Sequence, residues 1–310
     1  MFAVFFLAPA CKTSEYRVPE DARQASPQGC CEFGVGRGLR PLDRLSRLST
    51  IRLRNLFSSI GACGVAQFAV IMPAAGKSSR FHDKNYKKPF APLANRPVWL
   101  HSAERFLGRD DVKQLLLVIS PEDREYFQSR FAANVAILGI DVIEGGSERA
   151  ESVAKALARV KPGIDYVCVH DAARPLIVDE WITAVFDAAE KSGAAILATP
   201  VSNTLKRVGP NRAIQDTVSR EGLWEAQTPQ VFRRQLLLDA HARRGDFQAT
   251  DDAQLVERLG HTVTVVPGST INIKITTRED LRLAEHALKA LPKPKLTGPA
   301  HPFADDDMWK

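Results

Sequence analysis

The sequence predicts an α/β protein built on a mostly parallel sheet, with helices on both faces and a protruding β-arm. From Gln67 onward, short apolar runs rich in Val and Ile alternate with stretches of helical period. That alternation is typical of strands joined by crossover helices. The stretch from Pro200 to Gly222 interrupts the alternation with scattered apolar residues. We expect the arm there.

The expected elements follow one another along residues 67–292, which we take as the folded domain. The expected strands are Phe68 to Met72, Lys113 to Ile119, Val135 to Leu138 (or alternatively Asp141 to Ile143), Asp165 to Val169, Ala194 to Ala198 and Thr262 to Val266. The expected helices are Pro97 to Leu107, Pro121 to Arg130, Ser147 to Val160, Asp179 to Lys191, Asp251 to Leu259 and Arg278 to Leu291. Thr276 and Glu279 have the spacing of a capping box that opens the last helix.

The predicted arm, about residues 200–222, reads as two short strands. Its apolar residues, among them Leu205, Val208 and Ile214, are separated by polar residues and by the turn sequence Gly209-Pro210-Asn211. Two strands of this size bury too little apolar area to stay ordered alone. We therefore expect the arm to pack against a second copy of the chain, which makes the protein a homodimer.

The composition is that of a globular protein whose amino-terminal part differs from the rest. Of the 310 residues, 45% are hydrophobic and 25% are charged, and no apolar run is long enough to span a membrane. Residues 1–66 hold nine Lys or Arg against five Asp or Glu, so most of the net charge of +6 lies there. The basic balance therefore does not predict binding to nucleic acid, and no stripe of basic and aromatic residues supports it.

Residues 1–66 are expected to lie outside the folded domain. Gly, Ser and Arg dominate from Ser26 to Ser59 without a sustained apolar period. Three interpretations stay open: a disordered extension, an organelle-targeting segment, or residues upstream of the true start codon. The expected location is the cytoplasm, or a plastid-type organelle if the segment is a targeting signal. Residues 293–310 are expected to form a loose tail.

A loop of small residues follows the first expected strand. It reads Pro73-Ala-Ala-Gly-Lys-Ser-Ser-Arg80 and is followed by Lys87 and Lys88. Small residues let backbone N–H groups approach phosphate oxygens, and the cations supply the charge that a triphosphate needs. A Walker A loop is disfavoured, because Ile71 stands where that motif requires Gly. Taken alone, the loop is equally consistent with a simple strand-to-helix turn.

The sequence His170-Asp-Ala-Ala-Arg-Pro175 follows another buried strand. Ligands of open parallel sheets bind beyond the carboxyl ends of the strands, so Asp171 and Arg174 are expected to face the same crevice as the small-residue loop. One carboxylate there suits a Mg²⁺ ion that arrives with a triphosphate. The alternative is a helix cap by Asp171 with a structural Arg174. His170 is expected to be a packed residue.

A Gly-Gly turn opens the helix expected from Ser147, which is the predicted N-cap. The glycines allow a ligand to approach, and Arg149 and Ser152 lie three residues apart on one helical face, which suits a base or ribose pocket. Other residues suited to a phosphorylated second substrate are Thr204, Lys206, Arg207, Arg220, Gln227 to Gln230, Thr250 to Asp252 and Asn272 to Lys274. Each of these alone is more often a solvated surface residue.

Taken together, these segments resemble the 2-C-methyl-D-erythritol 4-phosphate cytidylyltransferase family over about Gln67 to Leu291. The matching blocks, in order, are Pro73 to Gly76, Arg80, Lys88, Gly145 to Ser152, Val169 to Pro175, Pro200 to Lys206, Gly222 to Gln230, Thr250 to Ala253 and Asn272 to Thr276. An ordered series of motifs is far more specific than any one of them. The resemblance implies a Rossmann-like nucleotidyltransferase fold.

The resemblance also implies the reaction and the residues that carry it. A sugar-alcohol phosphate attacks the α-phosphorus of CTP and releases pyrophosphate. The implied catalytic residues are Arg80, Lys88, Asp171 and Lys274, with Asp171 holding Mg²⁺. The residues implied for CTP are Ala74, Ala75, Gly76, Gly146, Arg149 and Ser152. Those implied for the second substrate are Arg174, Thr204, Arg220, Thr228 and Thr250, with Thr204 and Arg220 supplied by the arm of the neighbouring subunit.

The chain departs from the family pattern at three places. Ser78 replaces a usual Gly, Tyr86-Lys-Lys-Pro89 replaces the usual Pro-Lys-Gln, and an Asp often found before Asn272 is missing. Counting back from Asn95 favours Lys88 as the catalytic lysine over Lys87. Two other functions stay open: a ribitol-5-phosphate cytidylyltransferase, and a noncatalytic nucleotide-binding protein on the same fold. The set of cations and carboxylate argues against the latter.

Overall fold

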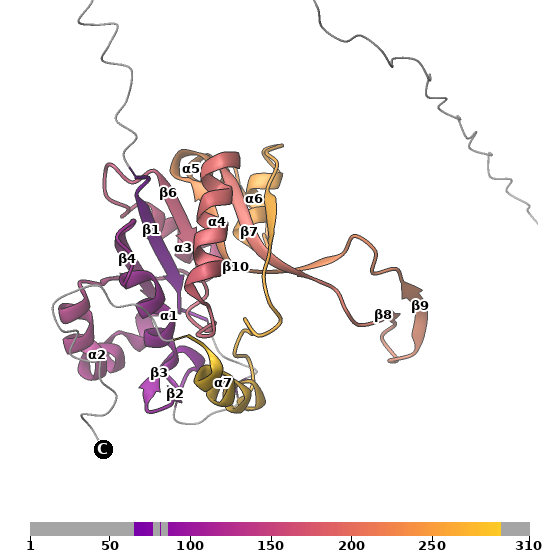
Figure 1. Cartoon of the computed structure of the whole chain (residues 1–310), viewed down its shortest axis with the longest axis horizontal. Coiled ribbons are helices and arrows are strands. Elements are labelled where there is room, and N and C mark those ends of the chain that lie inside the picture. Colours follow the sequence, from indigo (N-terminus) through magenta and orange to yellow (C-terminus); the bar gives the residue numbers. More distant parts are fainter. Residues whose placement is uncertain (1–64, 77–80, 82–85, 293–310) are drawn as a thin grey trace, which may run out of the picture. The chain divides into compact units, whose positions relative to one another are not determined.

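A seven-stranded sheet forms the centre of the computed structural model, which describes residues 65–76, 81 and 86–292 (Figure 1). The strands lie in the order β11-β7-β10-β6-β1-β4-β5. Their bounds are β1 Phe68–Pro73, β4 Val112–Ile119, β5 Asp141–Glu144, β6 Tyr166–Val169, β7 Ala194–Pro200, β10 Trp224–Arg233 and β11 Thr264–Pro267. Every neighbouring pair is parallel except those of β10, which runs antiparallel to β6 and β7. The predicted mostly parallel sheet is confirmed.

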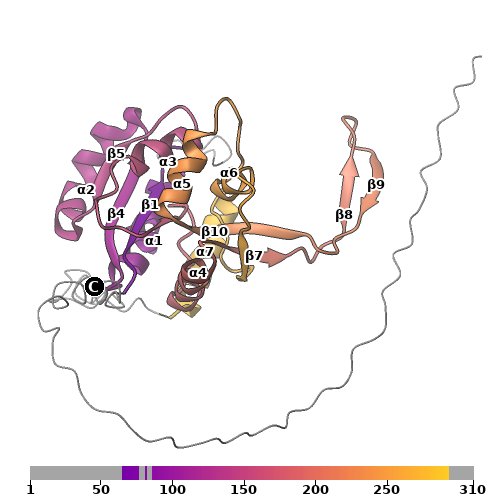
Figure 2. The same ribbon diagram turned by 90° about the horizontal axis from the view of Figure 1, so that it is seen from above.

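Helices cover both faces of the sheet, as Figure 2 shows from above. One face carries α1 (Val98–Leu107), α2 (Arg124–Leu138) and α4 (Asp179–Ser192). The other face carries α3 (Arg149–Leu157), α5 (Arg234–Ala242) and α6 (Asp252–Glu257). The predicted two-sided covering is therefore confirmed.

Strand β1 shows why the sheet takes this central position. Its residues from Phe68 to Met72 are fully buried and alternate between the two faces, as the pleat of a strand requires. Phe68 and Met72 belong to the cluster with α1 and α4, whereas Ile71 belongs to the cluster with α3, α5 and α6. The ring of Phe68 stacks on Phe186 of α4 with 3.9 Å between centroids. The loop that follows β1 therefore starts from the most firmly buried strand.

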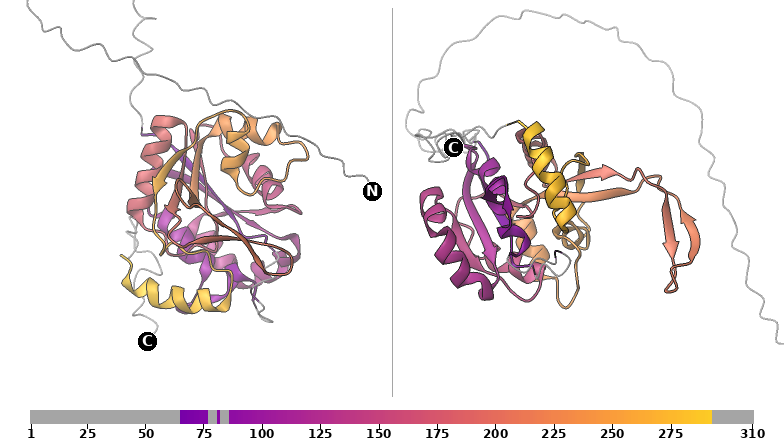
Figure 3. Two further views of the ribbon diagram at one scale, coloured as in Figure 1. Left: turned by 90° about the vertical axis from the view of Figure 1, so that its right-hand side faces the viewer. Right: turned by 90° about the horizontal axis from the view of Figure 1, so that it is seen from below.

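A third apolar cluster anchors the carboxyl-terminal helix α7 (Arg278–Ala290), which lies on the outside of this unit (Figure 3). The cluster joins Ala284 of α7 to Ile275 and to Leu93 in the small hairpin of β2 (Pro92–Leu93) and β3 (Arg96–Pro97). The anchored Ile275 directly follows Lys274 in the sequence. Packing of α7 therefore holds the segment that carries Lys274.

The predicted arm is confirmed. Strands β8 (Leu205–Val208) and β9 (Ile214–Val218) pair antiparallel and protrude from the ends of β7 and β10 (Figures 1 and 3). Apolar side chains on and next to the arm stay exposed within one chain. They include Val208, Ile214 and Trp224, with exposed fractions of 50%, 64% and 44%.

One predicted strand is wrong. Residues Val135 to Leu138 form the last turn of α2, where Val135 and Leu138 pack on the core at helical spacing. The helix ends at Gly139, whose φ of 63° is left-handed. The alternative strand, Asp141 to Ile143, is confirmed as β5. Helix α2 starts later than predicted, because a short 3₁₀ turn, η2 (Pro121–Asp123), precedes it.

The sequence did not predict β10 or α5. The β10 segment contains Pro229, which cannot donate to a ladder, and polar residues around it, so it does not read as a strand. In the structure, Pro229 and its polar neighbours lie where the strand pairing is irregular: the register of β10 with β7 shifts between Ala226 and Gln230. The helical pattern of α5 (Arg234–Ala242), which follows β10, was not predicted from the sequence either.

Two predicted helix caps also differ from the structure. Ser147 is not an N-cap: its backbone N–H and hydroxyl both donate to the Glu151 carboxylate, and α3 begins at Arg149. The capping box of α7 lies one residue later than predicted. There, Thr277 Oγ accepts the Asp280 N–H at 3.2 Å, and Asp280 accepts the Thr277 N–H at 2.8 Å.

The described residues all belong to one compact unit. Among them, no helix is long and apolar enough to cross a membrane.

The capping box generates a stability prediction. Thr277→Ala removes the acceptor for the Asp280 N–H and should lower the free energy of unfolding by about 1 kcal/mol, as is usual for a lost N-cap. Urea unfolding measures the change. Glu285→Ala, an exposed change in the middle of α7, is the matched control and should have little effect. Equal stability of the two variants would contradict the capping role.

Candidate active site

A cavity of about 650 Å³ opens where β1, β4, β5 and β6 end. Ala74, Ser120 and Gly145, which directly follow β1, β4 and β5, line it, as does Asp171, the second residue after β6. The carboxyl ends of parallel strands are the usual ligand-binding edge of an open α/β sheet. A larger cavity, about 790 Å³, lies between α2, β5 and α3, but none of the predicted site residues that the structure describes lines it. The smaller cavity is therefore the candidate site.

The small-residue loop and the Gly-Gly turn form one wall of the cavity. The Ala74 N–H donates to Val118 O at 2.7 Å, and the Gly145 N–H donates to Ile119 O at 2.8 Å, so both segments are tied to β4. A Cβ on Gly145 would lie 2.9 Å from the Cβ of Ala75 and 2.8 Å from Ser152 Oγ, which only glycine avoids. Ser152 Oγ accepts the N–H of Gly146 at 3.0 Å. Ala74, Ala75, Gly76, Gly146 and Ser152 thus line the same cavity.

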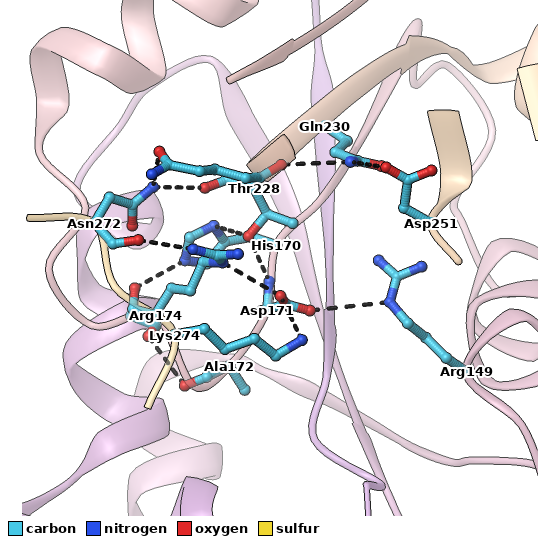
Figure 4. Close-up of polar contacts among 12 residues, drawn as sticks. Arg149, His170, Asp171, Ala172, Arg174, Thr228, Gln230, Asp251, Asn272 and Lys274 are labelled. Atoms are coloured by element: carbon cyan, nitrogen blue, oxygen red, sulfur yellow. Dashed lines mark hydrogen bonds and ion pairs between the residues drawn. The ribbon is translucent and has the colours of Figure 1, made fainter. Parts of the chain in front are cut away.

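The carboxylate of Asp171 lies among three cations (Figure 4). Lys274 Nζ is 2.9 Å from Oδ2, Arg174 Nε is 3.4 Å from Oδ2, and Arg149 Nε is 3.9 Å from Oδ1. Burial alone would raise the pKa of Asp171, but Lys274, Arg149 and Arg174 outweigh it and hold the pKa well below its usual range. Asp171 is therefore ionised at neutral pH.

A neutral hydrogen-bonded layer supports Asp171 from behind. The backbone N–H of Asp171 donates to Thr228 Oγ at 3.0 Å, and His170 Nδ1 lies 3.2 Å from the same oxygen. His170 Nε2 lies 3.1 Å from Arg174 O. Burial, more than the opposing pull of Asp171, lowers the pKa of His170 to about 4, so the imidazole is neutral at pH 7. The prediction that His170 is a packed residue agrees with this position.

Arg149 is the first residue of α3 and connects two carboxylates. Besides its contact with Asp171, its Nη1 lies 2.7 Å from Oδ2 of Asp252 at the start of α6. Its side chain is 27% exposed and lines the cavity. The neighbouring carboxylates outweigh the effect of burial and raise its pKa further above its usual range. The arginine is thus a permanent cation at the cavity wall.

Lys87 and Lys88 both line the cavity. Lys87 Nζ lies 2.8 Å from Asp123 and 3.8 Å from Glu122, both in η2. Lys88 begins the short 3₁₀ turn η1 (Lys88–Phe90). The charge of Lys87 is therefore balanced by carboxylates of the cavity rim.

Several predicted site residues lie elsewhere, and neither Arg174 nor Thr228 lines the cavity. Arg174 donates to Asn272 O at 2.7 Å behind Asp171, and Thr228 is only 4% exposed. Thr250 is exposed beside α6, where its hydroxyl and N–H donate to Gln254. Thr204 directly precedes β8 and Arg220 follows β9, so both lie on the arm, and neither lines the cavity of its own chain. Figure 2 shows the arm protruding from the sheet. Arg80 lies outside the described residues.

Sequence analysis named Gln230 and Asn272 only as candidates for the second substrate and did not predict that, as buried polar residues, they join the site segments. Gln230 accepts the N–H groups of Asp252 and Ala253 at 3.2 Å each, and its amide donates to Asp251 at 2.8 Å. Asn272 donates to Thr228 O at 3.0 Å. The available signal was their polarity within otherwise buried segments, because buried polar groups are nearly always hydrogen-bonded.

One wall of the cavity consists of small residues, so a ligand can approach its backbone closely. The other side carries a carboxylate surrounded by cations at the strand ends. This combination suits a nucleoside triphosphate. Fold and cavity together define a nucleotidyltransferase of the Rossmann-like α/β type.

Comparison with known proteins specifies the family. The family model described as IspD, 2-C-methyl-D-erythritol 4-phosphate cytidylyltransferase, matches residues 68–290. A protein of that name from Rhodopirellula baltica is 44% identical over 234 residues, which are 72% of this chain and 95% of the relative. Another, from Pelotomaculum thermopropionicum, is 41% identical over 225 residues, covering 72% of this chain and 94% of the relative.

Solved structures agree with the sequence comparison. The crystal structure of 2-C-methyl-D-erythritol 4-phosphate cytidylyltransferase from Thermus thermophilus is similar with a TM-score of 0.58 and 33% identity. The match covers 72% of this chain and 98% of that one. The chain belongs to the 2-C-methyl-D-erythritol 4-phosphate cytidylyltransferase family.

The depressed pKa of His170 predicts a pH-dependent loss of stability. An unfolded histidine binds a proton near pH 6.5, whereas folded His170 binds one only near pH 4, so protonation favours unfolding as the pH falls through this window. Between pH 7 and pH 4.5 the loss should amount to roughly 2 to 3 kcal/mol.

Urea unfolding at both pH values, with EDTA present, measures this term. His170→Asn should lose less stability on acidification than the wild type, whereas His286→Asn, at an exposed site on α7, should behave like the wild type. The same acid-induced loss in all three proteins would show that His170 does not contribute.

Proposed function

We propose that this chain transfers a cytidylyl group from CTP to 2-C-methyl-D-erythritol 4-phosphate in isoprenoid biosynthesis, at the cavity beyond β1 and β6. The products are the cytidine diphosphate derivative of the sugar alcohol and pyrophosphate. One observation carries the assignment to this cavity: motifs from distant parts of the sequence meet there, including Ala74 to Gly76, Gly145 to Arg149, Asp171 and Lys274.

The nucleotide is proposed to lie against the wall of small residues. Backbone groups of Ala74, Ala75, Gly76 and Gly146 would contact CTP, because no side chains hold it away from them. Arg149 would contact the cytidine part. Ser152 would act through Gly146, since it already accepts that N–H.

The site has the chemistry to hold a Mg²⁺ ion at Asp171. The carboxylate is ionised, Lys274 and Arg174 pair with its Oδ2, and the contact of Arg149 with Oδ1 is long at 3.9 Å, so Oδ1 would be able to bind a metal. No group of three or more potential metal-binding side chains occurs among those residues. Mg²⁺ commonly takes one or two carboxylates and fills its other positions with phosphate and water. Bound there, the ion would neutralise phosphate charge.

The side chains of the cavity would do the remaining work by charge and position. Lys88, Arg80 and Lys274 would stabilise the negative charge that develops on the α-phosphate and on the leaving pyrophosphate. The attacking phosphate oxygen is already ionised, so no side-chain base is needed. Lys87 would position Lys88, because its own charge is balanced by η2.

The acceptor is proposed to bind between two subunits. Thr204 and Arg220 lie on the arm, away from their own cavity, and would reach the cavity of a partner. Burying Val208, Ile214 and Trp224 would remove exposed apolar area, which favours such a homodimer. Arg174 and Thr228 would act by supporting Asp171, and Thr250 by ordering the start of α6.

An assay of pyrophosphate release tests the activity. The full chain with Mg²⁺ should release pyrophosphate with CTP and 2-C-methyl-D-erythritol 4-phosphate, and not with ATP, GTP or UTP. Asp171→Asn and Lys88→Ala should each reduce turnover at least about a hundredfold, as expected for a lost transition-state charge. Thermal unfolding would verify that both variants fold.

The same assay separates the alternatives. Preference for ribitol 5-phosphate would assign a different acceptor. Binding of CTP without release from any acceptor would indicate a noncatalytic nucleotide-binding protein.

Mixing two inactive variants tests the shared site. Arg220→Ala has a defective arm and Asp171→Asn a defective cavity, so a mixed dimer pairs one intact cavity with one intact arm. Random reassortment should restore roughly one quarter of wild-type activity, because half of the dimers are mixed and each has one complete site. A mixture that stays inactive after subunit exchange, shown by differently tagged chains, would place the arm's function within its own subunit.

A further inference from the structure

Behind the cavity, charged side chains continue into the interior as a chain of contacts. Asp171 contacts Arg149, Arg149 contacts Asp252, and Asp252 contacts His241 of α5, whose Nε2 is 3.4 Å from Oδ1. The side chains of Asp252 and His241 are 1% and 6% exposed. Neither residue lines the cavity, so substrate does not touch them.

This arrangement is costly unless it serves a purpose. Removing a carboxylate from water costs several kcal/mol, and replacing buried ion pairs by apolar residues is often neutral or stabilising. Here the compensation comes from the Arg149 charge at 2.7 Å and from the His241 ring nitrogen at 3.4 Å, although among the described residues neither contact has ideal hydrogen-bond geometry. Burial would raise the pKa of Asp252, but Arg149 and His241 outweigh it and lower the pKa. The buried carboxylate therefore stays charged.

Arg149 lies between two carboxylates that attract it in different directions. Its guanidinium is 2.7 Å from Asp252 and 3.9 Å from Asp171. Without the charge of Asp252, the closest remaining anion would be Asp171, which already has Lys274 and Arg174 beside it. A further approach would occupy Oδ1, the oxygen that the proposed function needs for a metal ion.

We propose that Asp252 and His241 are a positioning pair that holds Arg149 at the nucleotide wall and off the Asp171 carboxylate. The backbone of Asp252 is held in place, because Gln230 accepts its N–H and Asp251 caps α6, the helix that begins at Asp252. His241 keeps the Asp252 carboxylate in place through Oδ1, while Arg149 contacts Oδ2. The inference rests on the proposed use of the cavity for CTP.

Nucleotide binding without turnover provides the first test. Calorimetry with CTP, with and without Mg²⁺ and without acceptor, should give a Kd about tenfold higher for His241→Leu, the size expected for one weakened charged contact. With both CTP and Mg²⁺ saturating, the kcat should change by less than about twofold, because His241 touches no reacting atom and saturating Mg²⁺ keeps Arg149 off Oδ1 of Asp171. His241→Gln, which keeps an N–H donor, should restore much of the affinity.

A matched control separates positioning from general destabilisation. Leu237→Ala removes a fully buried side chain one turn earlier on α5 and should lower the Tm without changing the Kd for CTP. If His241→Leu binds CTP as tightly as the wild type, or if Leu237→Ala weakens binding equally, the positioning role is wrong.

A crystal structure of Asp252→Asn tests the geometry independently of any ligand. The Arg149 guanidinium should move to hydrogen-bond distance of Asp171. An unchanged Arg149 would overturn the inference. If the wild type binds no CTP at all, the proposed function is wrong, but the position of Arg149 in the variant still shows whether Asp252 and His241 position Arg149. If Asp252→Asn does not fold, the structure of His241→Leu provides the same readout.

Discussion

The attraction between the Asp171 carboxylate and three cations holds the site together. Lys274, Arg174 and Arg149 approach it from the segment before α7, from its own loop and from α3. A buried carboxylate without such partners would take up a proton or destabilise the fold by several kcal/mol. Because the partners come from separate segments, one charge aligns the end of β6 with the other cavity walls.

Neutral groups and charged groups contact that carboxylate residue on different sides. Thr228 and the neutral His170 hold its backbone from the buried side, so no second charge competes with it there. Of the three cations, Arg149 and Lys274 line the cavity, where positive charge suits a triphosphate. The residues proposed to bind the acceptor, Thr204 and Arg220, are separate from this group. They lie on the arm, outside the cavity of their own chain.

How far the sequence predicted the fold depended on how local each element is. Strands such as β1 and β6 are apolar runs bounded by turns, so they were predicted closely. Strand β10 was missed because Pro229 and Gln230 obscure it, and Val135 to Leu138 was misassigned because a short apolar run fits either a helix or a strand. Loops at strand ends were predicted as site segments, since parallel strands deliver them to one edge. The family resemblance supplied their roles.

By itself, the sequence determined most of the strands and helices, the small-residue loop, the Gly-Gly turn and the carboxylate at the end of β6, because each depends on neighbouring residues. Only the tertiary structure decided what those residues face. It placed Arg174 and Thr228 behind Asp171 and connected Arg149 to Asp252 and His241. Such contacts depend on how helices pack across the sheet, and buried charges are paired by that packing rather than by spacing along the chain.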